Sequence, residues 1–201
     1  TGCAGSRFLN GTLDLHVQLE KELAEFVGKD DALVYSTGFT VNEGVVSCLT
    51  DRNDYIICDD RDHASIVDGR RLSFSQQLKY KHNDIADLEK QLQKCNPDSV
   101  KLIIVDGVFS MDGNVAPMDK ICELAEKYDA LVMVDESHSA GVVGPTGHGV
   151  AEQYDVYGRV DIFTGTLGKA FGGAMGGFTT GRKEIIDMLR QRSRPYLFSN
   201  S

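Results

Sequence analysis

Several features that would narrow the function of this 201-residue sequence are scarce or missing. It contains no tryptophan and only four prolines, and aromatic residues make up 8% of it. No run of about 20 apolar residues occurs, so we predict no segment that spans a membrane. The remaining composition, with 41% hydrophobic and 25% charged residues, is typical of one globular domain that buries its own core.

A surplus of positive charge is also absent. The sequence has 21 basic and 30 acidic residues, which gives a formal net charge of −9. Nucleic-acid-binding proteins normally present a basic face, so we predict no nucleic-acid partner. One basic cluster, over residues 182–194, is interpreted as a solvated helix that contacts an anion or another subunit.

Paired cysteines are missing as well. The five cysteines are Cys3, Cys48, Cys58, Cys95 and Cys122, and they form no CxxC pair and no zinc-like spacing with histidine. An odd, scattered set favours reduced, buried thiols and an intracellular, cytoplasmic setting. We predict no metal site from the sequence.

Short apolar runs alternate with amphipathic helices along the whole chain. The runs occur in "DALVY", "DYIICDD", "VKLIIVD", "ALVMVD" and "VDIFTG", and "GGFTTG" is a further candidate. Runs of β-branched residues that alternate with helices predict a mostly parallel sheet with helices on both faces. The sequence therefore favours a single α/β layer structure.

Two helices carry clear end signals. In the first, Glu20 lies on the polar side and Gly28 is expected to stop the helix. Its apolar face is formed by Leu15, Leu19, Leu23 and Phe26. The second helix, over residues 83–95, has Asn83 or Asp84 as its N-terminal cap.

Polar residues directly follow the apolar runs. They lie in the segments 36–38, 59–63, 106–110, 135–138 and 164–169. In open α/β sheets ligands bind beyond the carboxyl ends of the strands. We therefore expect all five segments to lie along one rim of the sheet and to form the functional site there.

Lys169 in "DIFTGTLGKAFGG" is the most unusual of these residues, because lysine is strongly hydrated and stands here in a glycine-rich turn. A phosphate-binding Walker loop is excluded, since Phe163 replaces its first glycine and Ala170 its hydroxyl residue. No G-x-G-x-x-G pattern occurs over residues 165–177 either. A Schiff-base lysine and an ordinary solvated lysine remain.

The Schiff-base interpretation requires companion groups. Asp135 could keep a pyridine nitrogen protonated, although alone it could equally be a turn aspartate. His138 could reach a phenolic oxygen, and His63 could lie over a flat ring, although a single histidine is more often structural. The amides of Gly38 and Phe39 would meet a phosphate at a helix N-terminus. Thr166 could add a hydroxyl donor. Together these residues favour a pyridoxal-phosphate site.

Four segments, "DHASIVDG", "DGVFSMDG", "MVDESHSAGVVG" and "TGTLGKAFGG", resemble the pyridoxal-phosphate α-oxoamine synthases. This family includes glycine C-acetyltransferase, serine palmitoyltransferase, 8-amino-7-oxononanoate synthase and 5-aminolevulinate synthase. The resemblance covers residues 5–201. It implies the fold-type I aminotransferase architecture, with a large cofactor domain and a homodimeric active site.

The resemblance also assigns roles to residues. It implies that Lys169 holds the cofactor covalently, that Asp135 partners the pyridine nitrogen and that His63 stacks on the ring and could deliver a proton. Ser110 would lie close to the ring substituents, and Ser199 would reach the cofactor of the neighbouring subunit. The remaining positions that match cofactor-binding residues are Gly38, Phe39, His138 and Thr166.

The two halves of the chain resemble different members of the family. From about Asp106 onward the sequence is closer to glycine C-acetyltransferase, which implies glycine and acetyl-CoA as substrates or the reverse cleavage. The first half is closer to serine palmitoyltransferase, which is the enzymatic alternative. A catalytically silent subunit of the same fold is the non-enzymatic alternative.

The ends of the sequence suggest a piece of a longer protein. It begins without methionine and ends just after the apolar run 196–198. Since family members are longer at both ends, we expect residues 1–201 to be a large domain that lacks an N-terminal segment and a C-terminal small domain. We also expect Tyr196, Leu197 and Phe198 to be exposed in a monomer and to mark a subunit contact.

Overall fold

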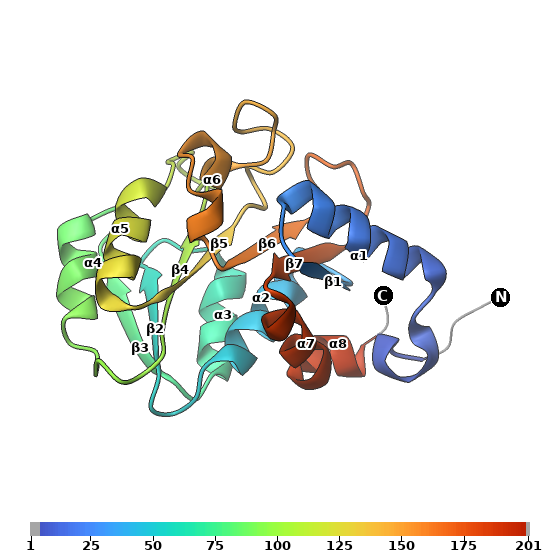
Figure 1. Cartoon of the computed structure of the whole chain (residues 1–201), viewed down its shortest axis with the longest axis horizontal. Coiled ribbons are helices and arrows are strands. Elements are labelled where there is room, and N and C mark those ends of the chain that lie inside the picture. The colour runs from blue at the N-terminus through green and yellow to red at the C-terminus, as the bar shows by residue number, and fades with distance from the viewer. Residues whose placement is uncertain (1–4, 200–201) are drawn as a thin grey trace.

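The computed structural model describes residues 5–199, which are organised around one seven-stranded sheet (Figure 1). The strands are β1 (Asp31–Tyr35), β2 (Tyr55–Asp59), β3 (Gln76–Tyr80), β4 (Lys101–Asp106), β5 (Leu131–Asp135), β6 (Ile162–Thr166) and β7 (Gly177–Gly181). Their order across the sheet is β1-β7-β6-β5-β4-β2-β3. β7, in the "GGFTTG" segment, pairs antiparallel with β1 and β6, and the other strand pairs are parallel. The predicted mostly parallel sheet is confirmed.

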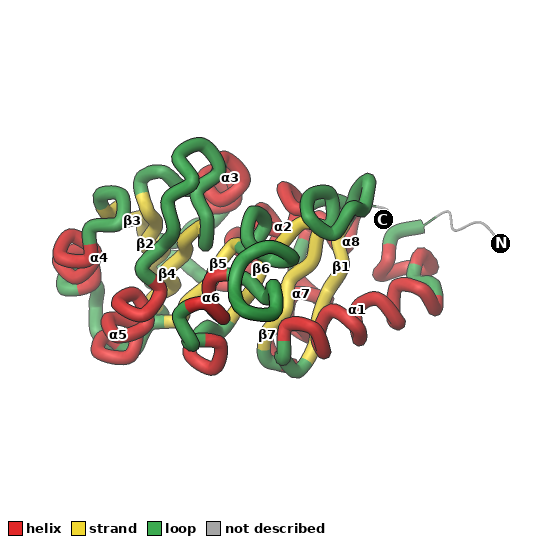
Figure 2. Tube along the Cα trace, turned by 90° about the horizontal axis from the view of Figure 1, so that it is seen from above, coloured by secondary structure: helices red, strands yellow, loops and turns green. Residues whose placement is uncertain are grey.

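Helices cover both faces of the sheet (Figure 2). They are α1 (Asp14–Val27), α2 (Gly38–Leu49), α3 (Ala64–Leu72), α4 (Ile85–Leu92), α5 (Met118–Tyr128), α6 (Val150–Gln153), α7 (Lys183–Arg192) and α8 (Arg194–Phe198). Because side chains alternate along a strand, Ala32 and Val34 of β1 join the core beneath α1, α4, α5 and α6. Leu33 and Tyr35 join a second core beneath α2, α3, α7 and α8.

The helix ends follow the local sequence signals. Gly28 ends α1 in the left-handed conformation, with φ of 68°, which glycine adopts without steric cost. Asp84, rather than Asn83, caps α4, because its side chain accepts a hydrogen bond from the Asp87 amide. In the same way the Thr37 hydroxyl accepts from the Thr40 amide at the start of α2. Among the helices described, none is long and apolar enough to cross a membrane.

Two expectations for α1 were wrong. Leu15 is 72% exposed, whereas the residues of α1 that are buried in the core, Leu23, Ala24 and Val27, lie in its later turns. Glu20, expected on the polar side, is buried. Its carboxylate accepts hydrogen bonds from Arg7 Nη2 at 2.9 Å, from the Val34 amide at 3.0 Å and from Arg190 Nη1 at 3.2 Å. These partners compensate the buried charge.

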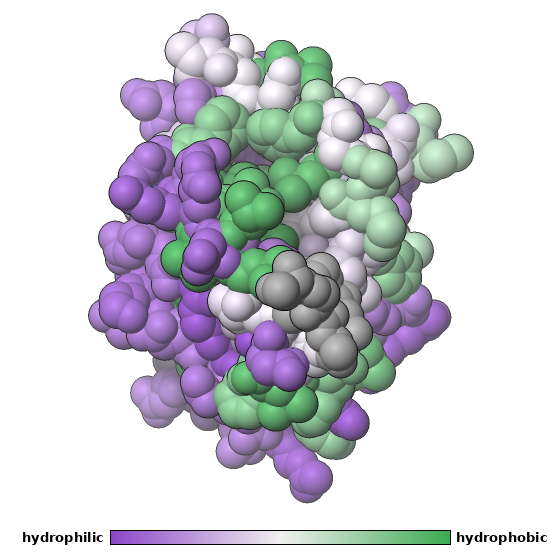
Figure 3. Space-filling view, turned by 90° about the vertical axis from the view of Figure 1, so that its right-hand side faces the viewer, coloured by the Kyte–Doolittle hydropathy of each residue, from purple (hydrophilic) through white to green (hydrophobic). Residues whose placement is uncertain are grey.

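The apolar run at the end of the chain is only partly exposed. Tyr196 is buried, because its ring packs against Tyr35 and lies below the Arg7 guanidinium. Its predicted exposure was therefore wrong, whereas Phe198 is 77% exposed. Hydrophobic residues also gather on the face of the molecule that lies at the right-hand side of Figure 1 (Figure 3). Exposed apolar side chains at the start of α1 include Leu13, Leu15 and Val17.

Candidate functional site

The carboxyl ends of the parallel strands form one rim, as expected, and a cavity of about 190 Å³ opens there. Seven of the nine residues selected from the sequence line it: Gly38, Phe39, His63, Asp135, His138, Thr166 and Lys169. They come from segments up to 131 positions apart, the separation of Gly38 and Lys169. The fold therefore brings together the residues that the sequence analysis grouped by chemistry.

One side of the cavity is the start of α2. Gly38 and Phe39 form its first turn, where amide N–H groups have no intrahelical acceptor and favour an anion. Gly38 also packs closely against the end of β6. A Cβ atom at this position would lie 2.8 Å from Thr166 Cβ, so a larger residue would force the two segments apart.

Asp135 ends β5 at the floor of the cavity and is buried. Its Oδ2 accepts a hydrogen bond from Asn42 Nδ2 at 2.6 Å, and its Oδ1 accepts one from the Ser137 amide at 2.9 Å. Asn42 Oδ1 in turn accepts from Thr164 Oγ1 at 3.0 Å. These contacts fix the orientation of the carboxylate without an ion pair.

Two basic groups, Lys169 and His138, line the same cavity as this carboxylate. Lys169 lies in the turn after β6 and lines the cavity. The residue as a whole is exposed, but its amine is partly buried. Partial burial of its amine lowers the pKa of Lys169, while the charges of Asp135 and Asp106 act in the opposite direction. Burial and the Lys169 charge also lower the pKa of His138. Both shifts increase the neutral, proton-accepting form of these groups.

His63 combines a structural position with access to the cavity. It caps α3, and its Nδ1 accepts a hydrogen bond from the Ser65 amide at 3.2 Å. Its own amide donates to Asp106 Oδ2 at 2.8 Å, and its ring meets the Phe39 ring edge-on at 6.2 Å between centroids. The structural interpretation and the functional one therefore apply to the same residue.

Asp106 ends β4 and also lines the cavity. Burial, reinforced by the nearby Asp135 charge, raises the pKa of Asp106 to about 8, although the His63 amide and Lys169 lower it. A carboxyl group with such a pKa is mostly neutral at pH 7. The cavity thus combines Asp106, whose pKa is raised, with the hydrogen-bonded side chain of Asp135.

Ser110 and Ser199 do not line the cavity. Ser110 follows the buried Phe109 and is exposed in the turn after β4. Ser199 follows α8, and its hydroxyl donates to the Pro195 carbonyl at 2.5 Å. Within this one chain, neither serine meets the other predicted residues.

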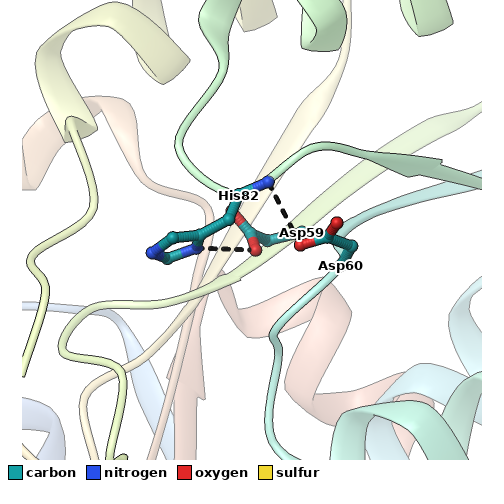
Figure 4. Close-up of side chains that lie close together, drawn as sticks. All are labelled: Asp59, Asp60 and His82. Atoms are coloured by element: carbon teal, nitrogen blue, oxygen red, sulfur yellow. Dashed lines mark hydrogen bonds and ion pairs between the residues drawn. The ribbon is translucent and has the colours of Figure 1, made fainter. Parts of the chain in front are cut away.

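The carboxylates of Asp59 and Asp60 and the imidazole of His82 lie close together, and none of the three lines this cavity (Figure 4). Asp59 Oδ1 lies 3.0 Å from His82 Nδ1, and Asp60 Oδ1 accepts from the His82 amide at 3.1 Å. The remaining His82 nitrogen contacts Asn114 at 2.9 Å. These bonds join the ends of β2 and β3 and explain the cluster, so we assign no metal to it.

Five lining residues were given no role from the sequence: Thr37, Asn42, Ser65, Asp106 and Ser137. Thr37, Asp106 and Ser137 stood in the rim segments 36–38, 106–110 and 135–138. Asn42 follows Gly38 by four residues, about one helical turn. That spacing is a usable signal. Ser65 offered none, because its contact with Asn42 spans 23 residues.

The class I and II aminotransferase model matches residues 2–201. The chain is 69% identical over 201 residues to a serine palmitoyltransferase of Bacteroides thetaiotaomicron, covering all of this chain and 51% of the relative. It is 54% identical over 202 residues to the 2-amino-3-ketobutyrate coenzyme A ligase of Salmonella typhimurium, with the same coverage. The chain thus spans about half the length of the curated relatives it matches.

Solved structures agree with this relationship. A serine palmitoyltransferase from S. paucimobilis, solved with a bound PLP–myriocin aldimine, is 38% identical and superimposes with a TM-score of 0.96, over 100% of this chain and 50% of that one. The resemblance to α-oxoamine synthases and the fold-type I architecture are confirmed. This chain belongs to the class I and II aminotransferase family, and its relatives there are α-oxoamine synthases.

Proposed function

We propose that residues 1–201 form the cofactor-binding large domain of a pyridoxal-phosphate enzyme that joins an amino acid to an acyl-CoA. The observation that carries this proposal is the meeting of Lys169, Asp135 and His138 at one cavity on the strand ends. A scaffold protein would need none of these three groups together, which argues against a catalytically silent subunit. The PLP-bound serine palmitoyltransferase with the same fold supports the cofactor.

The cavity has the donors that this cofactor requires. The first turn of α2 offers amides to a phosphate. Because Gly38 has no side chain, this turn can lie close to Thr166 and its amides remain uncovered. At the floor, Asp135 is held by Asn42 and Ser137 and presents a carboxylate for a ring nitrogen. Lys169 supplies the amine. The residues present fit pyridoxal phosphate.

When bound, pyridoxal phosphate supplies an aldehyde for amines and a ring that accepts electrons from the α-carbon of an amino acid. Lys169 Nζ, whose pKa is lowered by burial, is the base for the α-proton. Asp135 would make a charge-assisted hydrogen bond that keeps a proton on the ring nitrogen of the bound cofactor. His138, with its pKa lowered, would be a neutral hydrogen-bonding partner, and His63, which lines the cavity, would be a proton donor.

We propose serine and a long-chain acyl-CoA as the substrates. The serine palmitoyltransferase of Bacteroides thetaiotaomicron is 69% identical to this chain, against 54% for the coenzyme A ligase over nearly the same residues. Glycine with acetyl-CoA is the second candidate, favoured by that ligase and by the resemblance after Asp106.

The test combines spectroscopy with assays. The protein mixed with pyridoxal phosphate should develop a visible absorbance band, and borohydride should fix the cofactor covalently on Lys169. Release of CoA should then be faster with serine and palmitoyl-CoA than with glycine and acetyl-CoA. A protein that binds no pyridoxal phosphate, or that releases CoA with neither pair, would contradict the proposal.

We also propose a cytoplasmic homodimer. The cysteines described, Cys48, Cys58, Cys95 and Cys122, are all free thiols, which supports a reducing setting; Cys3 lies outside the described residues. The exposed Phe198 supports a contact with a partner subunit. Sedimentation with and without pyridoxal phosphate measures this association. In this proposal Ser199 reaches the cofactor of the other subunit.

A further inference from the structure

A continuous set of hydrogen-bonded side chains runs beside the cavity from β5 through α2 to the start of α3. Asn42 Nδ2 lies 2.6 Å from Asp135 Oδ2 and 2.9 Å from Ser65 Oγ. Ser65 Oγ lies 2.7 Å from His63 Nδ1. Asn42 and Ser65 are 2% and 1% exposed, so bulk water does not compete for these contacts.

The proton positions in this set follow from donor and acceptor chemistry. An ionised carboxylate only accepts, so the Asn42 amide must present its NH₂ group to Asp135. The second N–H of that group then points to Ser65 Oγ, which leaves the single Ser65 hydroxyl proton for His63 Nδ1. Thr164 Oγ1 donates to the Asn42 carbonyl oxygen at 3.0 Å, which holds the amide in this orientation.

His63 Nδ1 receives a second donor, the Ser65 amide, at 3.2 Å. A ring nitrogen that accepts two hydrogen bonds carries no proton, so the neutral imidazole has its proton on Nε2. Among the described residues, no hydrogen-bond partner of Nε2 is found, and the ring lines the cavity. The Nε2–H group is therefore the part of His63 that meets a ligand.

We propose that Asn42 and Ser65 are positioning residues that connect Asp135 to His63 and hold the His63 imidazole in the Nε2–H form. The connection rests on the proposed function only for the identity of the ligand in the cavity. Its consequence is a fixed division of roles. Asp135 is held as an acceptor and His63 as a donor, and both line the cavity.

The same contacts disfavour a proton on Nδ1 of His63. A proton on Nδ1 would face the Ser65 amide donor directly, and the Ser65 hydroxyl would lose its acceptor. The other charged or titratable groups around the ring are Asp106, Asp135, His138 and Lys169. None of these four donates to Nδ1, so the Ser65 contacts control that nitrogen.

The test measures the imidazole itself and needs no turnover. Nitrogen-15 NMR of histidine-labelled protein, without cofactor, reports which ring nitrogen carries the proton, and His63→Gln identifies the His63 signals. The wild-type protein should show the Nε2–H form. Ser65→Ala should populate the Nδ1–H form, because the Ser65 hydroxyl no longer donates to Nδ1.

Asn42→Ala should shift the same signals in the same direction by a smaller amount, because the Ser65 hydroxyl then loses a donor but keeps its contact with Nδ1. Thr164→Val, a nearly isosteric change, should give the smallest shift. Ser73→Ala is the matched control, since Ser73 is buried at the far end of α3 and hydrogen-bonds to Ser75 and Thr50. It should leave the His63 signals unchanged.

Circular dichroism identifies variants that fail to fold. If Asn42→Ala does not fold, Ser65→Ala and Thr164→Val still provide the test. An Nδ1–H form in the wild-type protein would overturn the proposal. So would unchanged His63 signals in folded Ser65→Ala. Pyridoxal-phosphate absorbance, measured separately on each variant, tests the proposed function, so the two ideas fail by different readouts.

Discussion

Two regions of this molecule bury acidic side chains, and they treat them in opposite ways. On α1, Glu20 is enclosed by two guanidinium groups and an amide. At the rim, Asp106 is equally buried, but its carboxyl group accepts from the neutral His63 amide, and the charge of Asp135 lies nearby. The first arrangement compensates a charge, whereas the second makes ionisation of Asp106 unfavourable.

The surroundings of a buried carboxyl group distinguish a structural role, as for Glu20, from a functional one, as for Asp106. Glu20 connects α1 to Arg190 on α7 and to the segment before α1, so its contacts stabilise the packing. The groups at the rim line an open cavity and have shifted pKa values, which is typical of reactive sites. The variants below test this division.

Lys169→Ala should have the largest effect on function and a small effect on the fold. It removes the amine proposed to hold pyridoxal phosphate, so borohydride should fix no cofactor at the site. Absorbance and mass spectrometry of the reduced protein measure this loss, with the exposed Lys120→Ala as control. Covalent labelling at the site in Lys169→Ala would show that another lysine is the attachment point.

Glu20→Gln should have a large effect on stability. Removing one partner of a buried ion pair leaves uncompensated charge, which here resides on Arg7, and costs about 3–5 kcal/mol of unfolding free energy. Urea denaturation measures the loss. Glu22→Gln, on the exposed side of the same helix, should change stability by less than about 0.5 kcal/mol. Equal effects of the two changes would remove the structural role of Glu20.

Asp106→Asn should alter the pH dependence of stability. The Asp106 pKa is about 8 in the folded chain and about 3.9 in an unfolded one. The native state therefore binds more protons between these values, and this group lowers stability as pH rises from about 4 to 8. Asn removes this contribution, so the difference in unfolding free energy between pH 5 and pH 8 should shrink.

Asp62, whose pKa burial also raises, adds a decrease of the same sign in both proteins, so the wild type and the variant must be compared directly. The exposed Asp119→Asn serves as the control and should leave the pH dependence as it is in the wild type. An Asp106→Asn protein with an unaltered slope would mean that Asp106 is ionised in the native state.

Ser110→Ala should have the smallest effect. The residue is exposed and lies outside the cavity, so the unfolding free energy should change by less than about 0.5 kcal/mol. As a proposed contact of the cofactor in the assembled enzyme, it should weaken pyridoxal-phosphate binding severalfold, measured by absorbance titration. Unchanged affinity would remove Ser110 from the proposed site.

Much of this arrangement could be predicted from the sequence. Apolar runs predicted the strands, and Gly28 and Asp84 marked the helix ends, because these signals act within a few residues. Seven of the nine selected residues reached one cavity, because carboxyl ends of parallel strands meet at one rim. The errors concern burial. Leu15 was expected to be buried and is exposed, whereas Glu20 was expected to be exposed and is buried. The contacts that bury Glu20 come from distant segments of the chain.

Local sequence patterns account for the alternation of strands and helices, for the rim and for the chemical types gathered there. Folding settles which acidic groups are compensated, which carboxyl group has a raised pKa and which nitrogen of His63 carries the proton. Those properties depend on partners such as Asn42 and Asp135, which are 93 residues apart. Periodicity and turn chemistry report the neighbours along the chain, whereas ionisation depends on the groups that folding places within a few ångströms.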